Sequence, residues 1–456
     1  MPKDRTRDMT VGAPMPILLS FILPLLLGLL FQQFYAMVDT VVVGNFLGME
    51  ALAGVGSTGS INFLVLGLCN GVCAGFAIPV AQKFGEKDFD GLRNFVGNMI
   101  WLGGIIALVV TAVTTIGCRA ILTAMDTPES TFSYAYDYIF LIFLGIPATM
   151  LYNLLSSILR SLGDSRTPLM FLVFSSLLNV ALDIVCVVTL QMGVAGAGWA
   201  TLISQLISGL LCLLYMDRKF PILHLKRENL VWRGHCVRRL LIMGLPMGLQ
   251  YSITAIGSIL LQTAVNGLGA VSMAAVAASG KVTNLFASPY DAMGTMAATY
   301  AGQNLGAGKL DRVHHGVKDC CILGVAYSLA ALVVMYFLGA QMTALFLDSK
   351  DVASSAQILP LARQLLVTNA AFYIPLLGVN LFRFTIQGLG YSNLAVIAGV
   401  SEMIARGAVA ALVSVFGFTA VCYASPAAWV LADCFLIPAY FVCMKRRKKE
   451  AAAVRE

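Results

Sequence analysis

The chain has 456 residues, of which 59% are hydrophobic and only 12% are charged, and its mean hydropathy is +0.83. Because average soluble domains are much less apolar, this composition excludes an ordinary soluble fold. The formal net charge of +7 could indicate an anionic partner, but the places where Lys and Arg occur matter more than their total.

Long apolar stretches recur from one end of the chain to the other. A bilayer core of about 30 Å requires roughly 20 apolar residues per helical span, whereas the strands of a membrane barrel would alternate polar and apolar residues. Runs such as LGGIIALVVTAVTTIG do not alternate, so we predict an all-α polytopic membrane protein. The first apolar stretch is too long for a signal peptide and is predicted to be the first span. The twelve predicted spans are 15–45, 52–80, 94–117, 133–159, 168–190, 193–216, 240–266, 270–300, 320–340, 357–387, 393–417 and 425–444.

The cysteines and histidines give no sign of a metal centre. The 11 cysteines are scattered, mostly within the predicted spans and without a CxxC pair, and the four histidines all fall in loops. This distribution favours neither a metal site nor a disulfide framework. We therefore expect the buried cysteines to act as small apolar residues.

Positive charge is concentrated on alternate loops. Most of the 30 Lys and Arg residues lie in the amino terminus, the even-numbered loops and the carboxyl tail, whereas the odd-numbered loops carry only Arg119 and Lys350. By the positive-inside rule, both termini and the long loop 217–239 are expected to face the cytoplasm. The basic tail KRRKK at 445–449 is then explained as a topology determinant near anionic lipid headgroups, so no nucleic-acid partner is expected.

Two halves of the chain repeat the same order of short motifs. Each half begins with a proline in an apolar stretch, Pro24 in FILPLLLG and Pro246 in MGLPMGLQ. NFLG and NGLG follow, and then AQKFGEKD and GQNLGAGK, both pairs offset by 221 residues. The same order continues with GIPATM and YIPLLG, and then with RSLGDS and QGLGYS. These collinear pairs indicate an internal duplication.

Each half holds six predicted spans, so both halves start on the cytoplasmic side and the repeat is parallel. We expect two pseudo-symmetric six-helix lobes around a central cleft. The expected boundaries are a lobe at 1–216, a basic cytoplasmic linker at 217–239, a lobe at 240–444 and a basic cytoplasmic tail at 445–456. Duplicated helices could also be only a packing solution, but in transporters such halves usually rock about a central site.

Five motifs are specific as a set because of their order and spacing: VDTVVVGNFLGMEALAGVG, AQKFGEKD, LRSLGDSRTP, LNVALDI and GQNLGAGKLDR. With them, nearly the whole chain resembles the multidrug and toxic compound extrusion (MATE) family, and within it the bacterial DinF-like branch. The resemblance implies cation-coupled export of small, often cationic, organic compounds across the bacterial cytoplasmic membrane. It also implies a functional monomer that is not an enzyme and that needs no cofactor besides a coupling ion, Na⁺ or H⁺.

Polar side chains in the first half share helix faces. In span 1, Gln32, Tyr35 and Asp39 follow one another at spacings of three and four, and in span 5 Asn179 and Asp183 are four residues apart. A carboxylate at mid-bilayer costs about 2.5 to 3.5 kcal/mol on insertion scales, so each acid should face a cavity or a partner. Gln32 and Tyr35 are therefore candidates for contact with a substrate.

The family resemblance implies a cation site formed by Asp39, Asn179, Asp183 and Thr201, which match the residue types that the family uses on helices 1, 5 and 6. Two carboxylates with neutral oxygens suit Na⁺. Two acids held close together could instead share one proton, so both ions stay open. Asn179 and Asp183 could also serve only to hold two helices together.

The second half departs from the first in its charged residues. LLQ at 260–262 stands where an equivalent of Asp39 would fall, so no duplicate cation site is expected. Span 11 instead carries Glu402 and Arg406 one helical turn apart. An ion pair between them is the default interpretation, and a role with substrate or in gating is the alternative, because buried pairs often specify geometry more than stability.

Further charges in the spans would also be costly to bury, and the sequence assigns them no firm role: Lys281, Asp291, Arg363, Arg383 and Asp433. Lys281 and Arg383 are candidate partners of Glu402 or Asp433.

The expected function is secondary active antiport by alternating access. Cation binding at Asp39 and Asp183 would repack helix 1 around a hinge at Pro24 and release the substrate. The alternative within the same superfamily is a lipid-linked oligosaccharide flippase, which should need several basic residues to bind a pyrophosphate. A membrane-embedded prenyl or acyl transferase should show DDxxD-like acid clusters or a histidine within the spans, and the sequence has neither.

Overall fold

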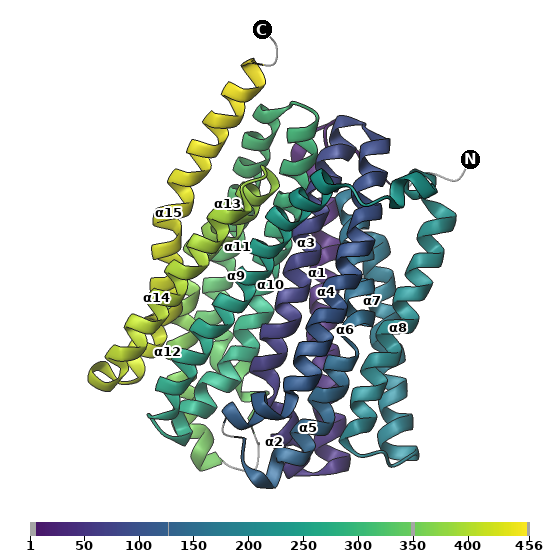
Figure 1. Cartoon of the computed structure of the whole chain (residues 1–456). Coiled ribbons are helices and arrows are strands. Elements are labelled where there is room, and N and C mark those ends of the chain that lie inside the picture. The colour runs from purple at the N-terminus through teal and green to yellow at the C-terminus, as the bar shows by residue number, and fades with distance from the viewer. Residues whose placement is uncertain (1–5, 126, 348–351, 454–456) are drawn as a thin grey trace. The chain divides into compact units, whose positions relative to one another are not determined.

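The structure is a computed structural model that describes residues 6–125, 127–347 and 352–453, without the side chains of 35–37, 39–41, 49 and 352–354. Within these ranges the chain forms helices and no strand (Figure 1). The α-helices are α1 (Pro14–Leu47), α2 (Met49–Ser57), α3 (Gly59–Glu86), α4 (Phe89–Ala124), α5 (Glu129–Leu144), α6 (Ile146–Ser161), α7 (Arg166–Asp183), α8 (Val194–Lys219), α9 (Gly234–Asn266), α10 (Ala270–Gly306), α11 (Leu310–Ala344), α12 (Val352–Ala371), α13 (Tyr373–Gly388), α14 (Ser392–Phe416) and α15 (Phe418–Ala453). The shorter elements are a π-helix, η1 (Ile184–Thr189), and two 3₁₀ turns, η2 (Pro221–Leu223) and η3 (Arg227–Leu230).

The helices confirm the twelve predicted spans. Among the described residues, ten are long and apolar enough to cross a membrane, and two bent pairs, α5 with α6 and α12 with α13, each meet the same criteria together. The bends are 47° and 51° and fall at the repeated motifs GIPATM and YIPLLG. Pro147 is the second residue of α6, where its missing N–H costs no hydrogen bond within α6, although it prevents α5 from continuing straight.

Contacts divide the chain into two compact units. Unit 1 comprises Leu23–Gly248 and the described residues up to Val11, and unit 2 comprises Gly12–Ile22 and the described residues from Leu249 onward. The division therefore falls inside α1 and α9, next to Pro24 and Pro246. The predicted lobes follow chain order and place each of these helices whole in one lobe, whereas the contacts assign the first turns of α1 to unit 2 and those of α9 to unit 1.

In unit 1, the start of α9 packs closely on α3. A Cβ added at Gly71 would lie 2.5 Å from the Met247 carbonyl oxygen, and one added at Gly75 would lie 2.6 Å from the Gly244 Cα. Only glycine allows the two backbones to approach this closely. These glycines therefore fix where the first half of α9 is held against α3.

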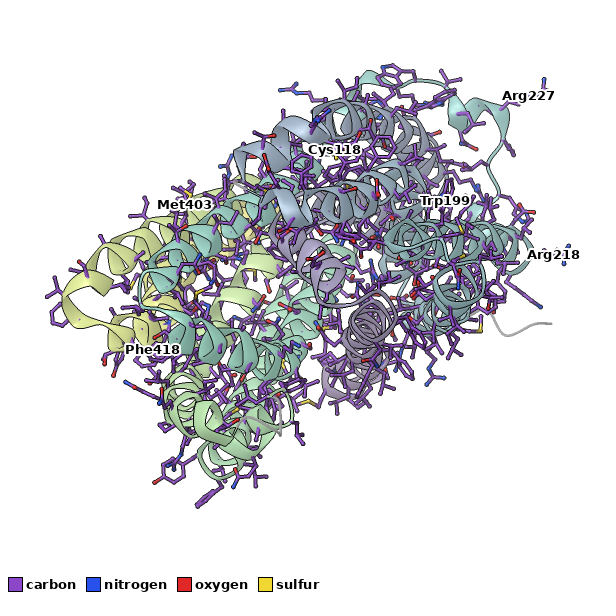
Figure 2. All side chains as sticks on the ribbon, turned by 90° about the horizontal axis from the view of Figure 1, so that it is seen from below. Cys118, Trp199, Arg218, Arg227, Met403 and Phe418 are labelled. Carbon is purple, nitrogen blue, oxygen red and sulfur yellow. The ribbon has the colours of Figure 1, made fainter. Side chains whose placement is uncertain are left out.

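The predicted linker 217–239 is an ordered part of unit 1. The Asn98 side chain, on α4, donates to the Val231 carbonyl (3.3 Å) and accepts from the Arg233 backbone N–H (3.0 Å). Asn229, in η3, donates to Asn94 (2.9 Å). Figure 2 shows the side chains of Arg218 and Arg227 at the outer edge of the helices of unit 1. The linker is therefore held to α4 by asparagines, while Arg218 and Arg227 reach outward.

In unit 2, α15 pairs with α14 after a turn at Phe418 and extends beyond the neighbouring helices (Figures 1 and 2). Its extension is the basic tail, which is helical up to Ala453. Arg447 donates to the Leu389 carbonyl (2.7 Å), and Lys448 pairs with Asp311 at 2.7 Å. The tail is thus attached to the loop after α13 and to the start of α11.

Candidate functional site

The segment before α7 fixes where α7 begins. Asp164 accepts hydrogen bonds from the backbone N–H groups of Arg166 (2.9 Å) and Thr167 (3.0 Å) and from the Thr167 hydroxyl (2.6 Å). These bonds satisfy donors that the first turn of a helix leaves unpaired. The motif LRSLGDSRTP is therefore a helix start, and it sets which residues of α7 face the interior.

Asn179 and Asp183 are buried on one face of α7, at 2% and 0% exposure. The Asn179 side-chain amide donates to the Thr201 hydroxyl on α8 at 3.4 Å, and Thr201 donates to the Ala197 carbonyl at 3.1 Å. Three of the four residues predicted for the cation site therefore lie on the facing helices α7 and α8. An acid with amide and hydroxyl oxygens nearby can take a proton or a hard cation.

A π-helix begins directly after Asp183. The residues Ile184–Thr189 leave the α-helical pattern, with the Leu190 N–H donating to the Val185 carbonyl at 2.8 Å. Close packing accompanies the change, since a Cβ on Gly196 would lie 3.1 Å from the Cys186 backbone. The π-helix was not predicted, and the one sequence signal for it is the β-branched run IVCVVT, which disfavours a regular α-helix. Such segments are frequent at functional sites.

The other predicted residues of helix 1 are partly outside the described structure. Asp39 and Tyr35 lie in α1, but their side chains are outside the described residues. Gln32 is exposed, and Pro24 is buried within a helix that continues through it. The participation of Asp39 in the cation site, the substrate contact of Gln32 and Tyr35, and the hinge at Pro24 therefore stay predictions.

In unit 2, Glu402 lies between two arginines. It pairs with Arg406, one turn along α14, at 3.3 Å, and it also accepts a hydrogen bond from Arg383 on α13. All three are buried, at 2% exposure for Glu402, 7% for Arg406 and 5% for Arg383. The predicted Glu402–Arg406 pair is confirmed. Of its two candidate further partners, Arg383 is the one that binds, whereas Lys281 lies over the Phe346 ring, 5.4 Å from its centroid.

The motif AQKFGEKD spans the end of α3 and the short connection to α4 in unit 1. Asp88 caps α4 by accepting from the Gly91 N–H at 2.9 Å, and it pairs with Lys83 at 2.9 Å. The Lys83 ammonium and then the Gly91 N–H hold the pKa of the Asp88 carboxyl below its usual range. This motif therefore stabilises the α3–α4 connection, and nothing in its geometry indicates binding.

Comparison with known proteins gives consistent results. The MatE family model matches residues 24–185 and 246–418, so one model fits two successive segments that begin at Pro24 and Pro246. The probable multidrug resistance protein YpnP of Bacillus subtilis is 28% identical over 383 residues, covering 84% of this chain and 83% of that protein. The FAD transporter of Shewanella oneidensis is 22% identical, covering 70% of this chain and 71% of that protein.

Solved structures show the same fold. A crystal structure of MATE in complex with MaL6 superposes with a TM-score of 0.90 at 20% identity, covering 98% of this chain and all of that one. An outward-facing multidrug resistance MATE family transporter of the MOP superfamily superposes with a TM-score of 0.89 at 20% identity, covering 98% of this chain and 99% of that one. The likeness extends over the whole length of both chains.

Proposed function

Because the chain belongs to the MatE family, we propose that it is a secondary active antiporter that exports small organic compounds from the cytoplasm in exchange for inward Na⁺ or H⁺. The names of its relatives support a transport role, since several are called multidrug resistance or multidrug export proteins. The protein would work as a monomer, without enzymatic activity, in the bacterial cytoplasmic membrane with both termini in the cytoplasm.

The observation that carries the proposal is the buried acid of unit 1. Asp183 lies at 0% exposure in a helix long enough to cross the membrane, on the same face as the Asn179–Thr201 hydrogen bond. A carboxylate is expensive to hold in that position, and such residues commonly bind ions or protons in transporters. The entering cation would neutralise Asp183, with Asp39 as its proposed second carboxylate, and alternating access around Pro24 would follow.

The driving force can be estimated from the charge that moves. One inward charge at 100 mV supplies about 2.3 kcal/mol, and a tenfold ion gradient supplies about 1.4 kcal/mol more. The sum would concentrate a neutral compound some hundreds-fold. For a monovalent cationic compound exchanged for one ion, the potential cancels and only the chemical gradient drives export.

The flippase alternative has less support from the charged residues of unit 2. Recognition of a pyrophosphate needs several basic groups that are available to it. Arg383 and Arg406 both bind Glu402, and two more acids, Asp291 and Asp433, interact electrostatically with Arg383. Three acids therefore face two arginines in this cluster, which favours a positively charged or neutral substrate over a pyrophosphate.

Efflux from proteoliposomes tests the proposal. The purified protein is reconstituted with ethidium inside, and Na⁺ and pH gradients are imposed separately, each at fixed membrane potential. We expect one of the two gradients to accelerate ethidium efflux, and we expect Asp183→Asn to abolish the acceleration. Asp319→Asn, an acid on α11, is the matched control and should behave as wild type. Gradient-independent efflux by wild type would contradict antiport, and gradient-driven efflux by Asp183→Asn would contradict the assigned site.

A further inference from the structure

The second part of the linker 217–239 carries a run of apolar side chains that the protein does not cover. Leu230, Val231 and Trp232 are consecutive and exposed, at 57% for Val231 and 52% for Trp232. In the first part of the linker, by contrast, Phe220 is buried in the core of unit 1. A contiguous exposed apolar run of this kind marks a surface that meets a partner or a membrane.

Helix α4 holds the backbone of this run in place. The Trp101 indole N–H donates to the Leu230 carbonyl at 2.9 Å, and Asn98 binds the backbone on both sides of Trp232. A Cβ added at Gly97 would collide with the carbonyl oxygen just before Leu230, so the linker backbone lies directly on α4. The exposed side chains are therefore held on the outer surface of unit 1 by contacts at successive residues.

The outer face of α4 shows at which level of the membrane the run lies. Between the two arginines of α4, the large exposed apolar side chains extend from Ile100 to Ile116. At a rise of 1.5 Å per residue this band is about 24 Å long, close to the thickness of a hydrocarbon core. Trp101 lies at one end of the band, where tryptophan is enriched at the boundary between lipid and water. Its bond to Leu230 therefore places the run at the level of the lipid headgroups.

Positive charge accompanies the run. The linker contains seven Lys and Arg residues but only two acids, Asp217 and Glu228. Lys226 and Arg227 come shortly before the run and are exposed, and Figure 2 shows Arg227 at the outer edge of unit 1. Lys226 pairs only loosely with Glu228, at 4.0 Å with both side chains 73% exposed. Basic groups beside apolar side chains at this level suit the phosphate of an anionic lipid.

We propose that residues 226–232 form an interfacial anchor, in which Val231 and Trp232 insert among the lipid headgroups and Lys226 and Arg227 bind the phosphate of an anionic phospholipid. In the orientation proposed above, this lipid belongs to the inner leaflet. The anchor is a property beyond export, because it needs neither substrate nor coupling ion. Since α9 begins at Gly234, the anchor also fixes the level of the start of α9 in the membrane.

Quenching of tryptophan fluorescence by brominated lipids tests the insertion. The protein is reconstituted in mixed bilayers of phosphatidylcholine and phosphatidylglycerol, and the contribution of Trp232 is the difference between wild type and Trp232→Phe. We expect bromine near the headgroup to quench this contribution at least about twofold more than bromine near the chain ends, because the anchor lies at the boundary. Quenching by acrylamide in the water, with none by either brominated lipid, would overturn the anchor.

Bromination of one lipid at a time tests the recognition of charge. At equal mole fractions, brominated phosphatidylglycerol should quench Trp232 at least about twofold more than brominated phosphatidylcholine, and added salt should weaken this preference. Lys226→Gln combined with Arg227→Gln should remove the preference but keep the quenching, since Val231 and Trp232 still insert. Lys445→Gln combined with Lys449→Gln removes the same charge from the tail in unit 2 and should leave the preference unchanged.

Two results would overturn the assignment of the lipid. Equal quenching of Trp232 by the two lipids in wild type would show that the anchor does not recognise charge. A loss of preference as large in the tail variant as in the linker variant would show that the total charge of the protein, and not Lys226 and Arg227, attracts the lipid. Neither substrate nor an ion gradient is present, so these outcomes are separate from those of the efflux assay.

Discussion

The close contact between α3 and α9 allows us to predict how much stability the protein loses when a glycine in that contact is replaced. In Gly71→Ala the new Cβ would lie 2.5 Å from the Met247 carbonyl oxygen and 2.7 Å from the Gly248 Cα. Both are backbone atoms, so no side chain can rotate away and the two helices must separate. Overpacking of this kind costs about 1 to 3 kcal/mol, and alanine in a helix returns about 0.5 to 1 kcal/mol relative to glycine. Because the new Cβ meets backbone atoms closer than 3 Å, we take the upper end of the overpacking range, and the expected net loss of stability is then about 2 kcal/mol.

Thermal unfolding in detergent measures the effect. For a unit of this size, each kcal/mol corresponds to about 2 to 4 °C, so Gly71→Ala should unfold several degrees below wild type. Gly104→Ala on α4 is the matched control, because an added Cβ there meets nothing within 4 Å. Alanine stabilises a helix relative to glycine, so the control should unfold at or above the wild-type temperature. An unchanged or higher unfolding temperature for Gly71→Ala would refute the close backbone contact.

Substitutions at three further sites test other contacts. Glu402→Leu should destabilise unit 2 by about 3 to 5 kcal/mol in denaturant unfolding, since two buried arginines lose their shared carboxylate, and an effect near zero would contradict the pairing. Asp164→Ala should cost about 1 kcal/mol by removing the cap of α7, whereas Asp164→Asn should retain most of that stability. Asp88→Asn should be slightly less stable than wild type at pH 7, by well under about 1 kcal/mol because Asp88 is partly exposed. The pKa of Asp88 is lowered in the folded state, so this difference should be present at neutral pH and should be lost only as the pH falls through that lowered pKa, and a difference that does not depend on pH would contradict the Lys83 interaction.

The helices could be predicted because the membrane imposes a simple rule on composition. Any span needs roughly 20 apolar residues, so the boundaries of α8 and α14 follow closely from where apolar residues begin and end. The duplicated motifs GIPATM and YIPLLG were predicted only to be equivalent positions of the two halves, and the bends at them were not predicted. The size of a bend between two helix segments is not specified by spacing along the chain.

Two features of the candidate sites depend on packing across helices and could not be predicted. The π-helix after Asp183 is accompanied by the close approach of Gly196 to Cys186, a contact between helices that the sequence does not specify. Arg383 could be named only as one of two candidate partners of Glu402, because residues on different helices have no fixed spacing in sequence. By contrast, Glu402 and Arg406 share one helix at a spacing of four, so their pairing was predictable from the sequence.

The order of residues along the chain also did not predict the unit to which the first turns of α1 and of α9 belong. Hydrophobicity predicts each of these helices as one continuous span. In the structure, the residues before and after the division near Pro24 or Pro246 belong by their contacts to different units. The signal that was present in the sequence is the repeated proline itself. Its consequence for packing is visible only when the neighbours of each turn are known, such as Gly71 and Gly75 against α9.

The most direct test of coupled antiport is ion movement driven by the organic compound itself. An inward ethidium gradient is imposed on proteoliposomes that contain the purified protein, with no ion gradient, and internal Na⁺ and pH are recorded with fluorescent indicators. The account predicts that ethidium entry drives one of the two ions outward in wild type, and that Asp183→Asn shows no such ion movement. Ethidium entry without movement of either ion in wild type, or equal ion movement in Asp183→Asn, would contradict it.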